Sequence, residues 1–375
     1  MKKVAIVGAG PAGLRAAEVL AESGVSAVTV FDQRPSAGRK FLVAGRGGLN
    51  LTHSEPLAQF VTRYSAGPWE RMLRVFGPED LRVWAAGRGV ETFVGTSGRV
   101  FPVEKQAARL LRRWIARLRE LGVDFRVKNR LTAIRPGPLV GLQIDGAWHE
   151  FDAVILALGG ASWPETGSDG SWPAMLTGHG ISITPWQPAN CGWEVDWPAE
   201  FLERFDGLPL KNLAVTAAGH RVRGELLITK YGLEGGALYQ LGSRLRKMEK
   251  PLLEINFRPD ATRPVSLERL PAPVRWLLKN RARGIQDVHS FPLPLQKPRP
   301  IDEAISSAGG VAWDELDETL QLYKAPGVFV CGEMIDWEGP TGGYLLQGCF
   351  TTATVAAQGA VARVAASVKP PATTG

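Results

Sequence analysis

The stretch Val4–Gly13 reads VAIVGAGPAG, an apolar run that stops at three glycines with the spacing Gly-x-Gly-x-x-Gly. The run predicts a buried strand, and the residues from about Gly13 to Ser23 predict the helix that follows it. In such a unit the first glycine permits the tight turn, the second lets the backbone approach a pyrophosphate, and the third lets the helix pack on the strand. The helix N-terminus adds free N–H groups and a partial positive charge. The stretch therefore predicts a dinucleotide-binding α/β domain.

An acidic residue follows at the expected distance. The segment Ala27–Phe31 predicts a second strand, and Asp32 at its end lies 19 residues beyond Gly13. A carboxylate at about this spacing binds ribose hydroxyls in dinucleotide-binding units. Asp32, with the adjacent Gln33, is therefore a candidate ligand of the adenosine half of the nucleotide.

A second stretch, near the other end of the chain, complements the first. Val328–Glu333 reads VFVCGE, an apolar run that ends in Gly-Glu, and Gly342-Gly343 follows it. This pattern is typical of the place where the ribityl chain of FAD is held. The two stretches are more than 300 residues apart. Together they predict FAD rather than another nucleotide, bound in a domain built from both ends of the chain.

Length and composition indicate one or two packed domains. The chain has 375 residues, of which 45% are hydrophobic, and no apolar run reaches the ~18–20 residues that span a bilayer. Lys2-Lys3 before an apolar run resembles the start of a secretory signal, but glycines, Pro11 and Arg15 interrupt that run. We therefore expect a cytoplasmic protein without a membrane-spanning segment.

The cysteines and histidines are sparse and scattered. Cys191, Cys331 and Cys349 form no Cys-x-x-Cys pair, which argues against a dithiol redox centre. The five histidines show no pair at metal-ligand spacing. We therefore expect no metal ion.

A net charge of +7 raises the question of nucleic-acid binding. The sharpest basic stretch is Lys105–Arg119, where apolar residues also recur at helical spacing, which indicates an amphipathic helix with its basic side in water. Aromatic residues are not interleaved there as a base-stacking platform requires. A solvated helix face explains the charge better, so we expect no nucleic-acid partner.

The rest of the chain separates into regions of different texture. Glycine-rich Ala37–His53 predicts a loop that approaches a ligand. Gly98–Pro102 predicts a turn into the basic helix, and four strands are expected after it, at Val123–Val127, Leu131–Ile134, Leu139–Ile144 and Trp148–Leu156. Tryptophan and proline become frequent from about Pro185, and proline-rich Phe291–Pro300 predicts a return linker. The expected domains are FAD-binding residues 1–184 and 301–368, an inserted β-rich substrate or lid domain at 185–300 with a small helical part, and a disordered tail at 369–375.

With these motifs in place, the chain resembles the bacterial NAD(P)/FAD-dependent oxidoreductases of the YhiN/BaiN type. The resemblance covers most of the chain and rests on ordered motifs. They are the N-terminal glycine turn, Gly38-Arg39-Lys40 with the loop to Asn50 and Thr52, Gly98–Pro102, Gly159-Gly160 with Thr166-Gly167, Gly224–Leu227, Ala308–Val311, Gly332-Glu333 and Gly342–Tyr344 with Gln347. Two features depart from the family. The usual Gly-Arg-Cys-Asn of the family reads Gly47-Gly48-Leu49-Asn50 here. The insert is also short, because only 28 residues separate Asp260 from His289, where the family often has a larger helical piece.

The resemblance implies a Rossmann-like FAD domain of the glutathione-reductase type, with Gly332-Glu333 at the ribityl hydroxyls and Gly342–Leu346 against the flavin ring. The residues expected to bind the cofactor are Gly8, Gly10, Pro11, Ala12, Gly13, Asp32, Gln33, Arg39, Lys40, Asn50, Thr52, Leu131, Ala157, Gly159, Gly160, Gly332, Glu333, Gly342, Gly343, Tyr344 and Leu345. A helix N-terminus near the flavin stabilises its anionic reduced form, by ~0.3–1 kcal/mol at exposed sites.

The leading hypothesis is an FAD-dependent oxidoreductase that passes a hydride between flavin N5 and a small-molecule substrate. Candidate acids or bases are Lys230, Tyr231, Arg46 and Asn50. No second Gly-x-Gly-x-x-Gly follows a strand, so the enzyme either takes NAD(P)H transiently at the flavin or uses O2 as an amine-type oxidase. A flavin-dependent RNA-modifying enzyme and a non-catalytic flavin-binding protein are the alternatives, and a monomer and a homodimer are both open.

Overall fold

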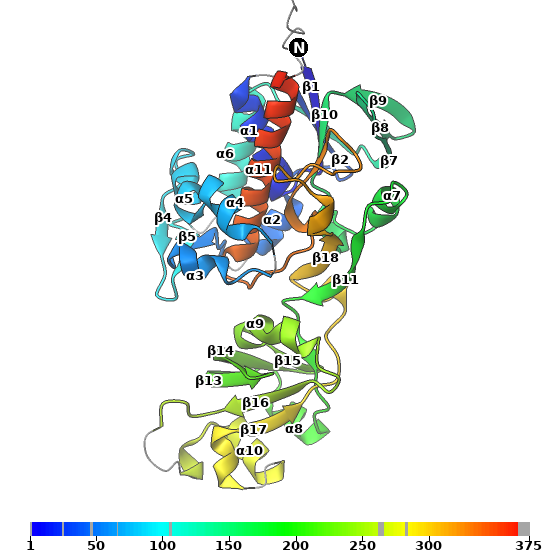
Figure 1. The fold of residues 1–375 in the computed structure, drawn as a ribbon. Helices are drawn as coiled ribbons and strands as arrows, with labels where there is room; N and C mark the ends of the chain where they lie inside the picture. Colours follow the sequence, from blue (N-terminus) through cyan, green and yellow to red (C-terminus); the bar gives the residue numbers. More distant parts are fainter. Residues whose placement is uncertain are drawn as a thin grey trace, which may run out of the picture. The chain divides into compact units, whose positions relative to one another are not determined.

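The computed structural model describes residues 2–24, 26–45, 48–65, 67–104, 107–261, 266–281 and 284–366. The chain divides into two compact units, Met1–Gln187 with Ala308–Gly375, and Pro188–Ser307 (Figure 1). Strands β11 (Ile183–Ala189) and β18 (Ser306–Val311) lead out of and back to the first unit and pair with each other.

The first unit is organised around a five-stranded sheet with the order β19-β10-β1-β2-β6, in which neighbouring strands are parallel. Its strands are β1 (Lys2–Val7), β2 (Ser26–Asp32), β6 (Asp124–Val127), β10 (Ala153–Leu156) and β19 (Val328–Val330). A strand from residue 328 onward thus lies in the same sheet as one that starts at residue 2. This confirms the expected Rossmann-type α/β fold built from both ends of the chain.

Three helices pack beside one another in this unit, α1 (Pro11–Ser23), α6 (Ala107–Glu120) and α11 (Tyr344–Ala366) (Figure 1). Helix α1 begins directly after the glycine turn, with Pro11 at its first position, where a missing N–H costs nothing. It ends at Gly24, which has the left-handed φ of 68° expected of a C-terminal cap. Most of helix α11 is buried, and its Phe350 packs against Trp84 and Trp114. Within the described parts of the chain, no helix has the length and apolarity needed to span a bilayer.

Smaller elements complete the first unit. The helices are α2 (Arg39–Ala44), α3 (Leu57–Val61), α4 (Trp69–Val75), α5 (Pro78–Ala86) and α7 (Pro173–Thr177). One three-stranded sheet has the order β3-β5-β4 and another the order β7-β8-β9. Their strands are β3 (Thr52–His53), β4 (Thr92–Val94), β5 (Arg99–Pro102), β7 (Leu131–Arg135), β8 (Val140–Ile144) and β9 (Ala147–Phe151).

The second unit is a six-stranded antiparallel sheet with the order β12-β15-β14-β13-β16-β17. Its strands are β12 (Trp193–Glu194), β13 (Pro209–Ala217), β14 (His220–Thr229), β15 (Gly232–Glu234), β16 (Leu252–Asn256) and β17 (Phe291–Pro294). Its helices are α8 (Ala199–Phe205), α9 (Gly236–Leu245) and α10 (Ala272–Asn280). A separate apolar core includes the fully buried Phe201, Leu238 and Ile255.

Four local expectations were wrong. Ala37–His53 is not one long loop, because α2 forms inside it. Gly98–Pro102 is not a simple turn, because β5 pairs with β3 and β4. The single strand expected at Trp148–Leu156 is two strands, β9 and β10, which belong to different sheets. The proline-rich return linker begins with β17, which occupies a sheet edge, where prolines are tolerated. The tail expected at 369–375 lies outside the described residues.

Candidate cofactor site

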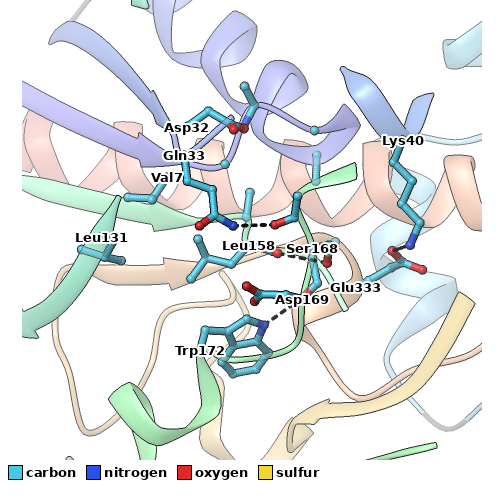
Figure 2. Close-up of a pocket in the computed structure, with 18 of the residues that line it drawn as sticks. Val7, Asp32, Gln33, Lys40, Leu131, Leu158, Ser168, Asp169, Trp172 and Glu333 are labelled. Atoms are coloured by element: carbon cyan, nitrogen blue, oxygen red, sulfur yellow. Dashed lines mark hydrogen bonds and ion pairs between the residues drawn. The ribbon is translucent and has the colours of Figure 1, made fainter. Parts of the chain in front are cut away.

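A cavity of about 550 Å³ lies in the first unit where β1, β2, β10 and β19 end (Figure 2). The carboxyl edge of a parallel sheet is where α/β proteins of this type bind their ligands. Thirteen of the predicted residues line it, and all but Leu131, at the start of β7, come from these strand ends or the segments after them. They are Gly8, Gly10, Pro11, Ala12, Asp32, Gln33, Arg39, Lys40, Leu131, Ala157, Gly159, Gly332 and Glu333.

The three glycines of the turn have three different surroundings. A Cβ on Gly8, whose φ is 106°, would lie 2.2 Å from the Ala157 carbonyl oxygen, and one on Gly13 would lie 1.8 Å from the Gly8 oxygen. A Cβ on Gly10 would meet nothing within 4 Å. The outer two glycines are therefore required by contacts within the protein, whereas Gly10 faces open space in the cavity. This is the arrangement that a pyrophosphate needs at the α1 N-terminus.

Asp32 is held at the end of β2 by two backbone donors. Its Oδ2 accepts from Ala9 N and its Oδ1 from Arg34 N, both at 2.7 Å. Burial raises the pKa of Asp32, against the opposing effect of these two hydrogen bonds and of the Arg34 and Arg39 guanidinium groups. Asp32 lines the cavity, and each carboxylate oxygen can accept a further hydrogen bond, so Asp32 could accept ribose hydroxyls.

The opposite side of the cavity carries an ion pair. Lys40 Nζ donates to Glu333 Oε2 at 2.9 Å (Figure 2). It also donates to Ser162 Oγ at 2.8 Å. Gly332, which precedes Glu333, has a φ of 72°, and a Cβ built on Gly332 would lie 2.9 Å from the Ala12 Cβ. The glycine therefore lets the end of β19 approach α1, which brings the Glu333 carboxylate to the cavity.

The remaining predicted ligands lie outside the cavity lining. They are Gly13, Asn50, Thr52, Gly160, Gly342, Gly343, Tyr344 and Leu345. Gly343 has a φ of 108°, and a Cβ there would lie 2.4 Å from the Thr52 backbone, so the start of α11 is seated directly on β3. Next to this contact, Thr52 Oγ1 and Asn50 Oδ1 are buried and have no hydrogen-bond partner among the described residues. Buried polar atoms are seldom left unpaired, so both atoms are candidates for the polar edge of the flavin.

Tyr344, at the start of α11, is anchored within the protein. Its hydroxyl donates to Glu55 Oε1 at 2.6 Å, and Arg63 holds Glu55 from the other side at 2.7 Å. The His53 ring stacks on Tyr344 at 5.3 Å. Burial, followed by the Glu55 carboxylate, raises the pKa of Tyr344 well above its usual range. These contacts fix the first turn of α11 rather than present the phenol to a ligand.

The candidate acid–base residues are dispersed. Lys230 and Tyr231 belong to the second unit, where Lys230 is exposed. The Tyr231 hydroxyl donates to the Glu234 carboxylate; burial and this carboxylate raise the pKa of Tyr231 above its usual range. Asn50 lies in the first unit beside the α11 start, and Arg46 lies outside the described residues. Where the chain is described, no group of His, Cys, Asp and Glu side chains is placed to hold a metal.

The segment after β10, residues 163–172, is here called the strap. The sequence placed Thr166-Gly167 among the family motifs, but the contacts of this segment with the end of β2 were not predicted. Gln33 Nε2 and Arg34 Nη2, just after β2, donate to strap carbonyls at Gly167 and Pro164, at 2.7 and 2.6 Å. Because β10 and β2 flank β1, the strap crosses the end of β1. Further lining residues that were not predicted include Ser36, Asn129, Arg130, Thr132, Ser168, Asp169, Trp172, Met175, Cys331 and Cys349. For the strap, the Thr166-Gly167 motif was the available signal.

Comparison with known proteins identifies the family. The HI0933-like protein Rossmann domain matches residues 2–359. The chain belongs to the HI0933-like family. A 3-dehydro-bile acid delta(4,6)-reductase from Clostridium scindens is 26% identical over 97% of this chain and all of its own. A ribosomal RNA dihydrouridine synthase from Escherichia coli is 24% identical over 95% of this chain and 97% of its own.

Among solved structures, a 3-ketosteroid-delta4-(5alpha)-dehydrogenase from Rhodococcus jostii has a TM-score of 0.53 at 14% identity. The match covers 95% of this chain and 96% of the dehydrogenase chain. At this identity the likeness concerns the fold alone. The family match and the curated relatives confirm the expected family, the Rossmann-type FAD-binding fold and the class of FAD-dependent oxidoreductase.

Proposed function

We propose that this HI0933-like protein is an FAD-dependent reductase of a carbon–carbon double bond conjugated to a carbonyl group, with NAD(P)H as electron donor. The observation that carries the proposal is the cavity between the glycine turn and Glu333, which has a carboxylate at each end and an open helix N-terminus between them. Its volume of about 550 Å³ falls in the ~300–1,000 Å³ range of ligand and cofactor sites.

The residues present fit FAD. The α1 N-terminus at Gly10 would bind the pyrophosphate, Asp32 the adenosine ribose, and Glu333 the ribityl hydroxyls. Asn50 and Thr52 would supply the unpaired oxygens for the flavin's polar edge. Bound FAD supplies the two-electron chemistry, by taking up a hydride and passing it on. The protein contributes binding, orientation and the electrostatics of the site.

The reaction class draws on the relatives. One is named for reduction at delta(4,6) of a 3-dehydro-bile acid and the other for making dihydrouridine. Dihydrouridine is uridine with one ring C=C saturated, so both names describe adding two hydrogens to a double bond conjugated to a carbonyl. A donor that binds transiently at the flavin agrees with the single Gly-x-Gly-x-x-Gly motif after a strand.

Anaerobic spectroscopy tests this function. Purified protein is expected to show a flavin spectrum that NAD(P)H bleaches and that a cyclic enone restores. Bleaching by an amine, with recovery in O2 alone, would establish an amine-type oxidase instead. Protein that neither carries nor binds FAD would overturn the proposal altogether.

A second candidate function is reduction of uridine in ribosomal RNA. The dihydrouridine synthase aligns along almost the whole of both chains, which favours an RNA substrate as much as a small one. Incubating protein and NADPH with rRNA transcripts, followed by mass spectrometry for a gain of two hydrogens on uridine, decides between them. Salt-sensitive RNA binding is expected if this function is correct.

A further inference from the structure

The ion pair between Lys40 and Glu333 connects three segments around the cavity. Lys40 lies on α2 after β2, Ser162 follows β10, and Glu333 follows β19. Helix α2 is itself fixed, because Gly38 N donates to Ala9 O at 2.8 Å and a Cβ on Gly38 would lie 2.5 Å from Leu111. Lys40 therefore extends from a rigid helix start toward a carboxylate on the far side of the sheet edge.

Both members of the pair are largely shielded from water. The exposed fraction is 24% for the Lys40 side chain and 14% for that of Glu333. Among the described residues, Lys40 is the one cation within ion-pair distance of Glu333. Ser162, which is fully buried, accepts a second hydrogen bond from Lys40. A charge pair in such surroundings interacts more strongly than one on the surface.

We propose that Lys40 is a positioning residue that neutralises Glu333 and thereby sets both FAD affinity and the redox poise of the bound flavin. An ionised carboxylate can accept hydroxyl hydrogen bonds, but its charge also repels the phosphates and an anionic reduced flavin. Lys40 cancels that charge while leaving Glu333 Oε1 available. The inference rests on FAD occupying this cavity, as proposed above.

A charge cycle tests the proposal with Lys40→Met, Glu333→Gln and the double variant. The readouts are FAD affinity for the apoprotein, by flavin fluorescence, and the two-electron midpoint potential of the reconstituted protein. Lys40→Met is expected to weaken FAD binding about tenfold and to lower the reduced-to-oxidised ratio about tenfold, which is ~30 mV for two electrons. The double variant is expected to recover most of the potential, because the uncompensated charge is gone.

Lys2→Met provides a matched control. Lys2 pairs with Asp152 at the same 2.9 Å, with exposed side-chain fractions of 29% and 18%, and lies at the opposite end of β1. This variant is expected to leave affinity and potential unchanged. Far-UV circular dichroism and thermal melting report whether each variant folds.

The outcomes are separable. Two results overturn the role of Lys40 while leaving FAD binding intact. One is a midpoint potential of Lys40→Met equal to that of the wild type. The other is a double variant whose potential shift is only the sum of the two single shifts. Wild-type protein that binds no FAD defeats the underlying function instead. Should Lys40→Met fail to fold, Lys40→Gln with the same two readouts replaces it.

Discussion

Two helices in the first unit, α1 and α11, each begin directly after a glycine, and the surroundings of the two glycines differ. At Gly10, before α1, a Cβ would meet nothing within 4 Å, whereas at Gly343, before α11, it would lie 2.4 Å from the Thr52 backbone. The first start is open toward a cavity and the second is closed onto β3. The same residue type thus serves ligand access in one place and close packing of the protein in the other. Substitutions should separate the two roles.

The largest effect is expected at the closed start. Gly343→Ala must relieve both a φ of 108° and the contact with Thr52, so we expect a loss of about 3 kcal/mol or more in the free energy of unfolding. Urea denaturation measures it. Gly24→Ala is the control, since Gly24 has a φ of 68° but open space around it, and about 1 kcal/mol is expected there. Equal losses in the two variants would contradict the packing role of Gly343.

At the open start, affinity should fall while stability is kept. Gly10 has a φ of −77°, which alanine adopts freely, so Gly10→Ala should cost less than about 1 kcal/mol of unfolding free energy. Its methyl group would occupy the space of the pyrophosphate, and FAD affinity is expected to fall at least about tenfold, ~1.4 kcal/mol. Fluorescence titration of apoprotein with FAD measures it. Unchanged affinity would show that the dinucleotide binds elsewhere.

The sequence predicted the open start better than the closed one. Gly8, Gly10, Gly13 and Asp32 belong to one local strand–helix–strand unit, so their spacing alone carried the information. The Gly343 contact depends on β3, almost 300 residues earlier in the chain, and no local pattern reveals it. The contacts of the strap were missed for the same reason, because its anchors Gln33 and Arg34 follow β2 while its carbonyls follow β10. Lys40 was predicted as a ligand, but its pairing with Glu333 depends on the order of strands in the sheet.

A substitution of Asp32 tests the proposed binding of the adenosine ribose beside the α1 N-terminus. Asp32→Asn removes a charged acceptor, and FAD affinity should fall roughly tenfold. The folded-state pKa of Asp32 lies above its ordinary 3.8, so folded wild type binds a proton before the unfolded chain does as the pH falls. Wild-type apoprotein should therefore gain stability relative to the variant between the raised value and 3.8. Urea midpoints at several pH values measure the difference, and a constant difference would contradict the burial of this carboxylate.

The smallest effect is expected at Tyr344. Tyr344→Phe removes the hydrogen bond to Glu55 but keeps the ring that stacks on His53. We expect a loss of about 1 kcal/mol in unfolding free energy and an unchanged FAD affinity, because the hydroxyl is engaged within the protein. Thermal melting and FAD titration provide the two readouts. A large loss of affinity would place the phenol at the flavin.

The cavity lining extends from Val7 to Cys349, and this has a consequence for biosynthesis. Nearly the whole chain must leave the ribosome before Glu333 can join the glycine turn, and at ~5–20 residues per second this takes tens of seconds. Strand β10 therefore waits for its late neighbour β19, and pairing so distant in sequence is intrinsically slow. Cofactor capture is accordingly a late event, and the nascent N-terminal half exposes an unfinished sheet edge until then.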